Sequence, residues 1–112
     1  MVIQDHIVHV AVPDAWERAR PTGHYMPGGF EVEGFIHCCT REQLEGVLRD
    51  HFPGHERVVL LVLDAGTIGW PIRYERAANG QDYAHVYGPI AVESVVEELE
   101  VRFEDGGWRL PA

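Results

Sequence analysis

The sequence predicts a single α+β domain, spanning residues 1–112, in which mostly antiparallel sheets form a cleft and about two helices pack against them. The chain of 112 residues has room for one hydrophobic core and none for a second domain. Its composition, 46% hydrophobic and 24% charged, is close to the globular average. Apolar runs of strand length outnumber segments with helical spacing, and turn residues separate them. These three observations favour sheets over a helical bundle.

The first third of the chain predicts a strand, a helix and a long loop. Residues 6–11, HIVHVA, form a β-branched run of strand length. Pro13 suits the first position of a helix, so we expect a helix over residues 13–20 with Trp16 on its apolar side. Residues 21–33 hold two prolines and three glycines, which indicates a loop. A loop of this length in a small domain is often a binding loop.

A strand and a capped helix follow. Residues 34–39, GFIHCC, predict the second strand. Thr40 and Gln43 have the spacing of a capping box, which predicts a helix over residues 41–52. Apolar residues recur at helical spacing within that segment, so its inner face should pack on a sheet.

Three further strands are expected before residue 90. Residues 58–63, VVLLVL, are almost wholly apolar and too short for a typical helix, so they predict a central strand buried on both faces. Residues 71–75 follow a turn and predict a short edge strand. Residues 82–88, DYAHVYG, predict another strand after a polar loop.

The C-terminal segment contains conflicting signals. Residues 92–101 hold good helix formers, but apolar and charged side chains alternate from Leu99 onward, as in a strand with one solvated face. Asp105-Gly106 is typical of a hairpin turn. The sequence therefore predicts a C-terminal β-hairpin over about residues 97–110.

The charge balance excludes several partners. The chain has nine arginines, no lysine and eighteen acidic residues, for a formal net charge of −9. Such a surface repels polyanions, so we expect neither nucleic acid nor an anionic membrane as a partner. No apolar run reaches the roughly 18 residues of a membrane span, and the first residues lack the pattern of a signal peptide. The expected location is the cytoplasm.

The two cysteines predict neither a disulfide nor a zinc site. Cys38 and Cys39 are adjacent, so in a strand they point to opposite faces and cannot readily bond to each other. The chain has no other cysteine, which excludes a CxxC zinc site. We interpret both as small apolar fillers.

Three histidines lie in the middle of predicted strands: His9, His37 and His85. Strand alternation places each on one face with neighbouring apolar or aromatic side chains, among them Phe35 and Tyr87. If the strands bring these faces together, they line a partly apolar cleft whose imidazoles exchange protons near neutral pH. The alternative for each is a partly buried histidine satisfied by a backbone carbonyl. The other histidines sit in turns or at element ends and should be solvated: His6, His24, His51 and His55.

A three-histidine zinc shell is a further alternative, because three imidazoles and a water can form a catalytic site. No HExxH or paired-carboxylate signature accompanies the histidines, so no metal is predicted. The phosphate-binding motifs GxGxxG and GxxxxGK[ST] are also missing.

Two charged residues on the predicted edge strand share a face with each other. Arg73 and Glu75 flank Tyr74. Either they belong to surface salt bridges, or Arg73 clamps an anion and Glu75 is an orienting or general-base carboxylate.

The order of five segments resembles a family of small bacterial proteins, the domain of unknown function 952. The segments are IVHVAVPDAWERA, GFIHCCTREQLEGV, VVLLVLD, PIRYE and YAHVYGPI, within residues 6–96. The motifs GFIHC-x-T and H-x-YGP are specific. This chain has Cys39 where the family typically has serine, and Val12 near a position that is typically threonine. Members look like compact relatives of the ADP-ribosyltransferase fold, in which two small antiparallel sheets form a cleft for NAD.

The resemblance implies roles for particular residues. His9 would match a histidine that contacts the NAD ribose, His37 would replace a conserved tyrosine, and His85 would fall near the catalytic glutamate. An imidazole does not substitute directly for that carboxylate, which steadies a cationic transition state by its charge. Either Glu75 supplies the charge, or the cleft performs another reaction, or it only binds.

These considerations give three hypotheses. The first is an ADP-ribosyltransferase-like enzyme acting on NAD or a related nucleotide. Its catalytic residues would be His37, His85 and Glu75, and its binding residues His9, Thr40, Arg73 and Tyr87. The second is a non-catalytic module that binds a small ligand or a protein. The third is a metal-dependent hydrolase.

Overall fold

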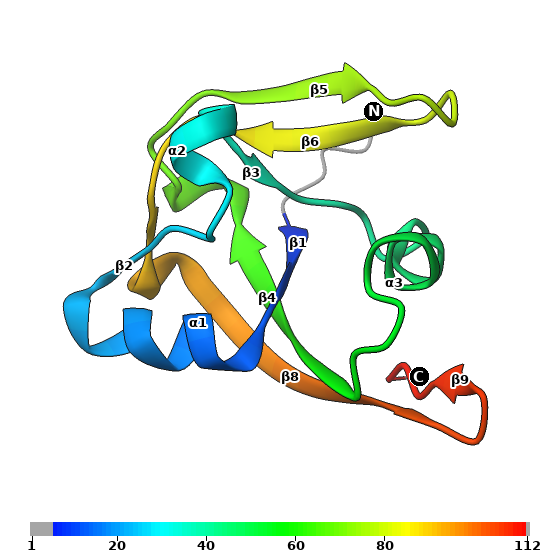
Figure 1. The fold of residues 1–112 in the computed structure, drawn as a ribbon. Helices are drawn as coiled ribbons and strands as arrows, with labels where there is room; N and C mark the ends of the chain where they lie inside the picture. Colours follow the sequence, from blue (N-terminus) through cyan, green and yellow to red (C-terminus); the bar gives the residue numbers. More distant parts are fainter. Residues whose placement is uncertain (1–5, 112) are drawn as a thin grey trace.

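Antiparallel sheets dominate the fold, which a computed structural model describes for residues 6–111. One sheet has four strands in the order β1-β4-β8-β9, a second has three in the order β3-β6-β5, and β2 pairs with β7 (Figure 1). Every pairing is antiparallel, as predicted. The strands are β1 His6–Ala11, β2 His24–Tyr25, β3 Ile36–His37, β4 Arg57–Asp64, β5 Ile72–Arg76, β6 Asp82–Val86, β7 Ile90–Ala91, β8 Val95–Glu104 and β9 Gly107–Trp108.

Short helices connect and cover the sheets. Two of them, α1 and α3, correspond to the predicted pair, and α2 is an additional single turn. None of the helices within residues 6–111 is long and apolar enough to cross a membrane. The α-helices are α1 Pro13–Ala19, α2 Phe30–Glu33 and α3 Leu44–His51; the 3-10 turns are η1 Arg20–Thr22, η2 Ala65–Thr67 and η3 Val92–Ser94.

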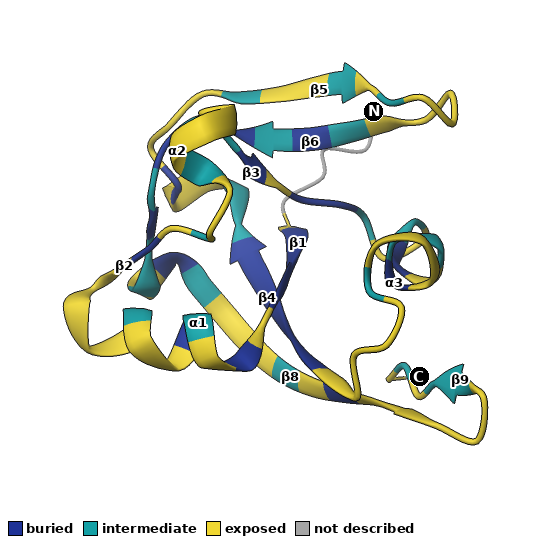
Figure 2. Cartoon of the chain, in the orientation of Figure 1, coloured by how far each residue is buried: buried dark blue, intermediate teal, exposed yellow. Residues whose placement is uncertain are grey.

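The apolar run VVLLVL forms the centre of the larger sheet. Strand β4 pairs with β1 on one side and β8 on the other, and its residues 58–63 are all buried (Figure 2). One face packs against α1 through Trp16, and the other packs against α3 through Leu44 and Leu48. The prediction of a central strand with both faces covered is confirmed, because only such a position shields a run without polar side chains.

The capping box forms, but α3 is shorter than predicted. The backbone N–H of Gln43 donates to Thr40 Oγ1 at 3.2 Å, and the Thr40 N–H donates to Gln43 Oε1 at 3.1 Å. Residues 41–43 form a turn, however, and the helix begins only at Leu44. The Gln43 side chain also donates to the Asp82 carbonyl oxygen at 2.9 Å, which ties this turn to β6.

The predicted loop over residues 21–33 is more ordered than its composition indicates. It contains η1, β2 and α2, and β2 pairs with β7. Gly34 has a φ of 82° and accepts the left-handed conformation that ends α2. Because helix geometry extends to this glycine, the predicted strand over residues 34–39 shrinks to β3, and Cys39 makes only an isolated bridge to Val8.

The C-terminal hairpin forms as predicted, although its first strand starts earlier, at Val95. Leu99 and Val101 pack in the core cluster with α3, while Glu98 and Glu100 on either side of Leu99 are exposed. Asp105 and Gly106 have φ values of 51° and 78°. Positive φ at both central residues matches the right-handed twist of the two strands, which is why the Asp-Gly pair turns the chain here.

Gly88, in the segment H-x-YGP, is required by close packing. A Cβ atom added there would overlap the indole ring of Trp70. We expect Gly88→Ala to lower the free energy of unfolding by about 1–3 kcal/mol, because the ring must leave its position. Urea denaturation measures this loss. The same substitution in a Trp70→Ala background should cost much less, and an equal cost in both backgrounds would contradict the explanation.

Candidate functional site

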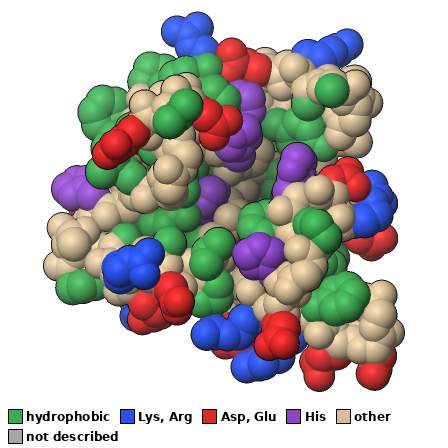
Figure 3. Space-filling model, viewed as in Figure 1, with side chains coloured by type: hydrophobic (Ala, Val, Ile, Leu, Met, Phe, Trp, Pro, Cys, Tyr) green, Lys and Arg blue, Asp and Glu red, His purple; other side chains and the backbone are tan. Residues whose placement is uncertain are grey.

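A cleft of about 690 Å³ lies between the two larger sheets, α2 and α3. Figure 3 shows histidine side chains around a hollow in the middle of this face of the molecule. His9, His37 and His85 all contribute to its lining, as the alternation of their strands predicts. The register of β3 and β6 pairs His37 directly with His85, which explains their proximity. The other ionisable side chains at the cleft are Glu33, Cys38, Cys39, Asp50, His51, Tyr25 and Tyr83.

His9 lies at the floor of the cleft with both ring nitrogens engaged. It is 6% exposed. Its Nδ1 lies 2.6 Å from the carbonyl oxygen of His37, and since a carbonyl only accepts, Nδ1–H donates. The Tyr25 hydroxyl lies 2.8 Å from Nε2 and donates to it when the ring is neutral. His9 therefore fits the alternative of a satisfied buried histidine, and it positions the backbone of His37.

Burial keeps His9 neutral. It lowers the pKa of the imidazole to about 4, and the nearby His37 adds to this effect, while the bond to the His37 carbonyl opposes it. Burial also raises the pKa of the Tyr25 phenol, so this hydroxyl keeps its proton. The floor of the cleft is thus an uncharged hydrogen-bonded pair.

His85 forms a pair with Glu75. Its Nδ1 lies 2.7 Å from Glu75 Oε1, and because a carboxylate only accepts, Nδ1–H donates and the neutral ring leaves Nε2 as an acceptor. The Tyr87 hydroxyl donates a short hydrogen bond to the same Oε1 atom. These two bonds, that of Tyr87 first, lower the pKa of Glu75, and the carboxylate in turn raises the pKa of Tyr87. Glu75 stays ionised and fixes the His85 ring.

A second histidine–carboxylate pair faces the first. His37 Nε2 lies 2.9 Å from Glu33 Oε2 at the end of α2. The rings of His37 and His85 are edge to face with centroids 5.0 Å apart. Phe35 stacks on His85 at 4.1 Å and contacts His37 edge to face at 4.9 Å. The aromatic ring holds both imidazoles in place, which gives the cleft two acid/base groups side by side.

Other residues predicted for the site lie outside its lining. Thr40 belongs to the capping box. Arg73 lies over the ring of Tyr87, with its guanidinium carbon 5.6 Å from the ring centroid. The Tyr87 ring in turn contacts Phe35, which lines the cleft. Glu75 is reached only through His85 and Tyr87. Arg73 and Glu75 thus belong to a layer that supports the cleft wall; Glu75 is paired with His85, and Arg73 contacts the ring of Tyr87.

Both cysteines belong to the core of the protein. Cys38 and Cys39 are free and buried, each in a different core cluster, although the strand ends before them at His37. Burial raises the pKa of the Cys38 thiol, and that of Cys39 to about 12, so both stay protonated. Within residues 6–111 no group of three or more histidine, cysteine or acidic side chains is arranged to hold a metal ion. His9 has no free nitrogen for one.

Several residues of the cleft were not predicted from the sequence, among them four with ionisable side chains. Tyr25 and Glu33 fell within the predicted loop, and Asp50 and His51 lie at the end of α3. His51 is exposed, as predicted, yet it borders the cleft. No spacing signal marks these positions, because tertiary packing brings them there: the pairing of β2 with β7 places Tyr25, and the positions of α2 and α3 place the other three.

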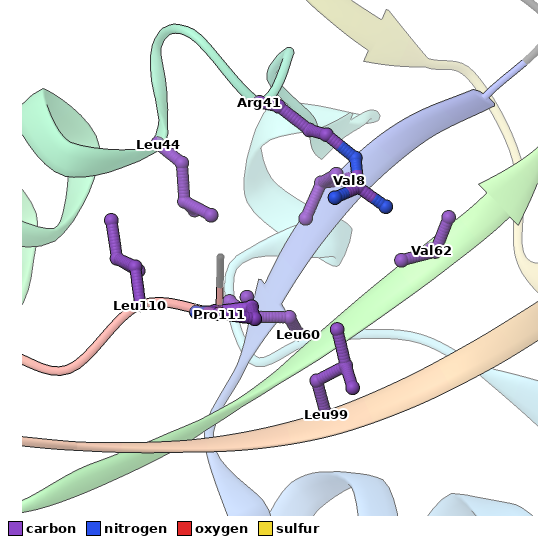
Figure 4. A pocket seen from close by; sticks show the side chains of 8 residues that line it. All are labelled: Val8, Arg41, Leu44, Leu60, Val62, Leu99, Leu110 and Pro111. Atoms are coloured by element: carbon purple, nitrogen blue, oxygen red, sulfur yellow. The ribbon is translucent and has the colours of Figure 1, made fainter.

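A smaller pocket of about 240 Å³ lies near the C-terminal segment. Figure 4 shows Arg41 reaching toward Val8 at one side of it, with Leu44 and Leu110 at another. Among its described lining residues Arg41 alone is ionisable. Because it lacks an acid/base pair, we take the larger cleft as the candidate site.

Comparison with known proteins identifies the family. The family model described as "Protein of unknown function (DUF952)" matches residues 10–98. The chain belongs to this family. The resemblance to this family over residues 6–96 is therefore confirmed, and this DUF952 protein has the mostly antiparallel α+β architecture predicted from its sequence. A search of curated proteins finds no match.

Solved structures of similar fold come from Caulobacter crescentus. The crystal structure of protein CC0527 is 25% identical to this DUF952 protein, with a TM-score of 0.82, and the match covers 91% of this chain and 90% of that one. The solution NMR structure of CC0527 is 24% identical with a TM-score of 0.79, covering 94% and 91%. Their descriptions name neither an activity nor a ligand. They support the fold and leave the function to the chemistry of the cleft.

Proposed function

We propose that the cleft binds a nucleotide of the NAD class and that His85 is its acid/base group. The observation that carries this proposal is the hydrogen bond from His85 Nδ1 to the ionised Glu75 at 2.7 Å. A carboxylate behind a histidine fixes the tautomer and orientation of the ring and stabilises its protonated form. The opposite nitrogen, Nε2, is then ready to take a proton from a substrate.

The arrangement suits His85 as the base and Glu75 as its orienting group. In the proposed transfer, an acceptor hydroxyl oxygen attacks C1′ of the nicotinamide ribose, and the bond from C1′ to the ring nitrogen breaks. The bonding electrons leave with nicotinamide, which becomes neutral, and His85 Nε2 takes the hydroxyl proton. His37 contacts the departing base. Arg73, beside Tyr87 and outside the cleft lining, is the proposed partner of the diphosphate.

The first test measures binding and turnover together. We expect saturable heat when the protein is titrated with NAD or ADP-ribose, and release of nicotinamide from NAD when an acceptor is present. His85→Ala should lower that rate by about 10²–10⁴, the usual contribution of a general base. Glu75→Gln should lower the rate as well, because the ring loses the carboxylate that fixes its orientation.

Glu97→Gln is the matched control, since Glu97 is an exposed carboxylate on β8 outside the cleft lining. Its rate should equal that of the unmodified protein. The proposal is wrong if neither nucleotide gives heat at millimolar concentration. It is also wrong if His85→Ala, shown to be folded by circular dichroism, retains full activity.

A second candidate function is a non-catalytic binding module, which is favoured because the carboxylates near the cleft already have hydrogen-bond partners. Glu33 is bonded to His37, Asp50 to Arg49 and Glu75 to His85. Each of these carboxylates, in the lining or behind it, already accepts a hydrogen bond, so direct contact with a cationic transition state would require one of them to give up its partner. Binding of NAD without any release of nicotinamide would favour the module over the enzyme.

A further inference from the structure

The charges around the cleft differ from those of a typical nucleotide site. Its described lining contains two carboxylates, Glu33 and Asp50, and no arginine; the chain has no lysine. Arg49 pairs with Asp50 from outside the lining, and Arg73 lies behind Tyr87. An anionic group inside the cleft would therefore meet carboxylates without an arginine of the lining to balance them.

The walls of the cleft are aromatic as well as acidic. Four half-buried aromatic rings line it, and the buried ring of Tyr25 forms part of its floor; the four are Phe30, Phe35, Phe52 and Tyr83. The faces of such rings carry partial negative charge and attract organic cations. Aromatic rings and carboxylates together are the composition of sites that bind quaternary ammonium and related ions.

Glu33 gives the cleft its least compensated charge. Its carboxylate accepts a hydrogen bond from the His37 imidazole, and a neutral imidazole does not cancel the negative charge of Glu33. The charge of Asp50 is offset by Arg49, whose Nε lies 3.0 Å from Asp50 Oδ1. The net charge of −9 over the whole chain adds a field of the same sign, which attracts cations toward the cleft. The local and the long-range fields thus act in the same direction.

From these observations we infer that the cleft selects organic cations: a positively charged nitrogen carried on an apolar or aromatic body. The inference shares one premise with the proposed function, namely that this cleft is the ligand site, and names the charge that its ligand carries there. In a NAD-class ligand the positively charged group that enters the cleft is the pyridinium ring, and the anionic diphosphate stays outside the residues that line it. The inference also applies to cations that are not nucleotides.

A pair of probes that differ only in charge tests the inference. Acetylcholine and 3,3-dimethylbutyl acetate have the same shape, but the first has a quaternary nitrogen where the second has carbon. In calorimetric titrations at constant ionic strength we expect the cation to bind on the order of ten-fold more tightly, as cation–π and carboxylate attraction together predict. Equal affinities, or no binding of acetylcholine at millimolar concentration, would overturn the inference.

A variant of Glu33 locates the effect in the cleft. Glu33→Gln should reduce the preference for the cation severalfold and leave the affinity for the neutral ester unchanged. Glu31→Gln is the matched control, because Glu31 lies on the same helix turn, is exposed and does not line the cleft. An equal loss with Glu31→Gln would show a general surface effect and contradict the inference.

Titration with NAD in the same experiment separates this inference from the proposed function. If acetylcholine shows the charge preference and NAD does not bind, the cation site stands and the nucleotide proposal is wrong. If NAD binds and the two esters bind equally, the nucleotide proposal stands and charge selection is wrong.

Discussion

Replacement of Trp16 by alanine is expected to lower the free energy of unfolding by about 3–5 kcal/mol, the usual cost of deleting a large buried aromatic side chain. Trp16 is 1% exposed and fills the space between α1 and the larger sheet. Its ring lies edge to face on Tyr25, with centroids 5.8 Å apart, and its Nε1–H donates to Glu98 Oε1 at 2.6 Å. The substitution removes the packing, the aromatic contact and the hydrogen bond together. Urea denaturation followed by fluorescence or circular dichroism measures the loss.

Two further variants separate these contributions. Trp16→Phe keeps much of the volume and loses the bond to Glu98, so we expect a smaller loss of about 1–3 kcal/mol. Trp70→Ala is the control for size, because the Trp70 side chain is 47% exposed and buries much less surface. If Trp70→Ala cost as much as Trp16→Ala, burial under α1 would not be the reason for the effect.

The same substitution should affect the cleft. Trp16 supports Tyr25, whose hydroxyl is bonded to His9, and His9 holds the backbone of His37. A cavity under Tyr25 allows this ring to move and loosens the chain of contacts. In Trp16→Ala we therefore expect weaker ligand binding even under conditions where the variant is fully folded.

Elements with strong local signals were predictable from the sequence. Pro13 starts α1, the apolar run over residues 58–63 forms β4, and Asp105-Gly106 closes the C-terminal hairpin. In each case a local property, such as a fixed φ, the absence of polar side chains or a tolerance of positive φ, leaves one favourable structure. Tertiary contacts then agree with the local preference.

Residues 21–39 were predicted less well, because several weak signals compete there. The glycines and prolines indicate a loop, but Phe30 and Tyr25 can bury their rings only if the chain folds back on the sheets. That packing orders α2 and β2, and Gly34 then ends the helix turn close to β3. Local composition does not contain this information, since the partners are β7 and the core beneath α1.

The sequence predicted which histidines line the candidate site, but it did not predict their hydrogen-bond partners or the supporting role of His9. Strand alternation brought His37 and His85 to one surface, and their register confirms it. On β1 the rule is less informative: Ile7 and Ala11 share the face of His9 by alternation, yet both are fully buried among core residues that include Trp16 and Tyr25. Burial turns His9 from a predicted ligand contact into a support, and it moves Glu75 behind His85.

His9 should make the protein lose stability in mild acid. Its pKa is about 4 in the folded state, against about 6.5 in the unfolded chain. Between these two values the unfolded state binds more protons, so the free energy of unfolding falls as the pH falls. For a single group with these values, the loss is about 2 kcal/mol between pH 7 and pH 5 and about 3 kcal/mol in total below pH 4. Above pH 6.5 this contribution is fully present and constant.

Urea denaturation at pH 7 and pH 5 measures the effect, and two variants assign it to His9. His9→Asn retains an amide donor for the His37 carbonyl and has no group that titrates in this range. We expect this variant to be less stable than the unmodified protein at pH 7. Between pH 7 and pH 5, however, its free energy of unfolding should fall by about 2 kcal/mol less than that of the unmodified protein. His24→Asn replaces an exposed histidine and should leave the loss unchanged. An undiminished loss in His9→Asn would show that another group is responsible.

Protonation of His9 also has a structural consequence for the cleft. The Tyr25 hydroxyl donates to Nε2 only while that nitrogen is unprotonated, and after protonation both groups carry a hydrogen. Tyr25 must then rotate its hydroxyl and accept, and the charged ring, which is only 6% exposed, loses most of its hydration. Because His9 also holds the His37 carbonyl, acid should loosen the floor of the cleft before the rest of the fold. Since His9 in the folded protein takes up its proton only around pH 4, ligand binding is expected to weaken as the pH falls toward 4, whereas the loss of stability begins near pH 6.5; His9→Asn should reduce both dependences.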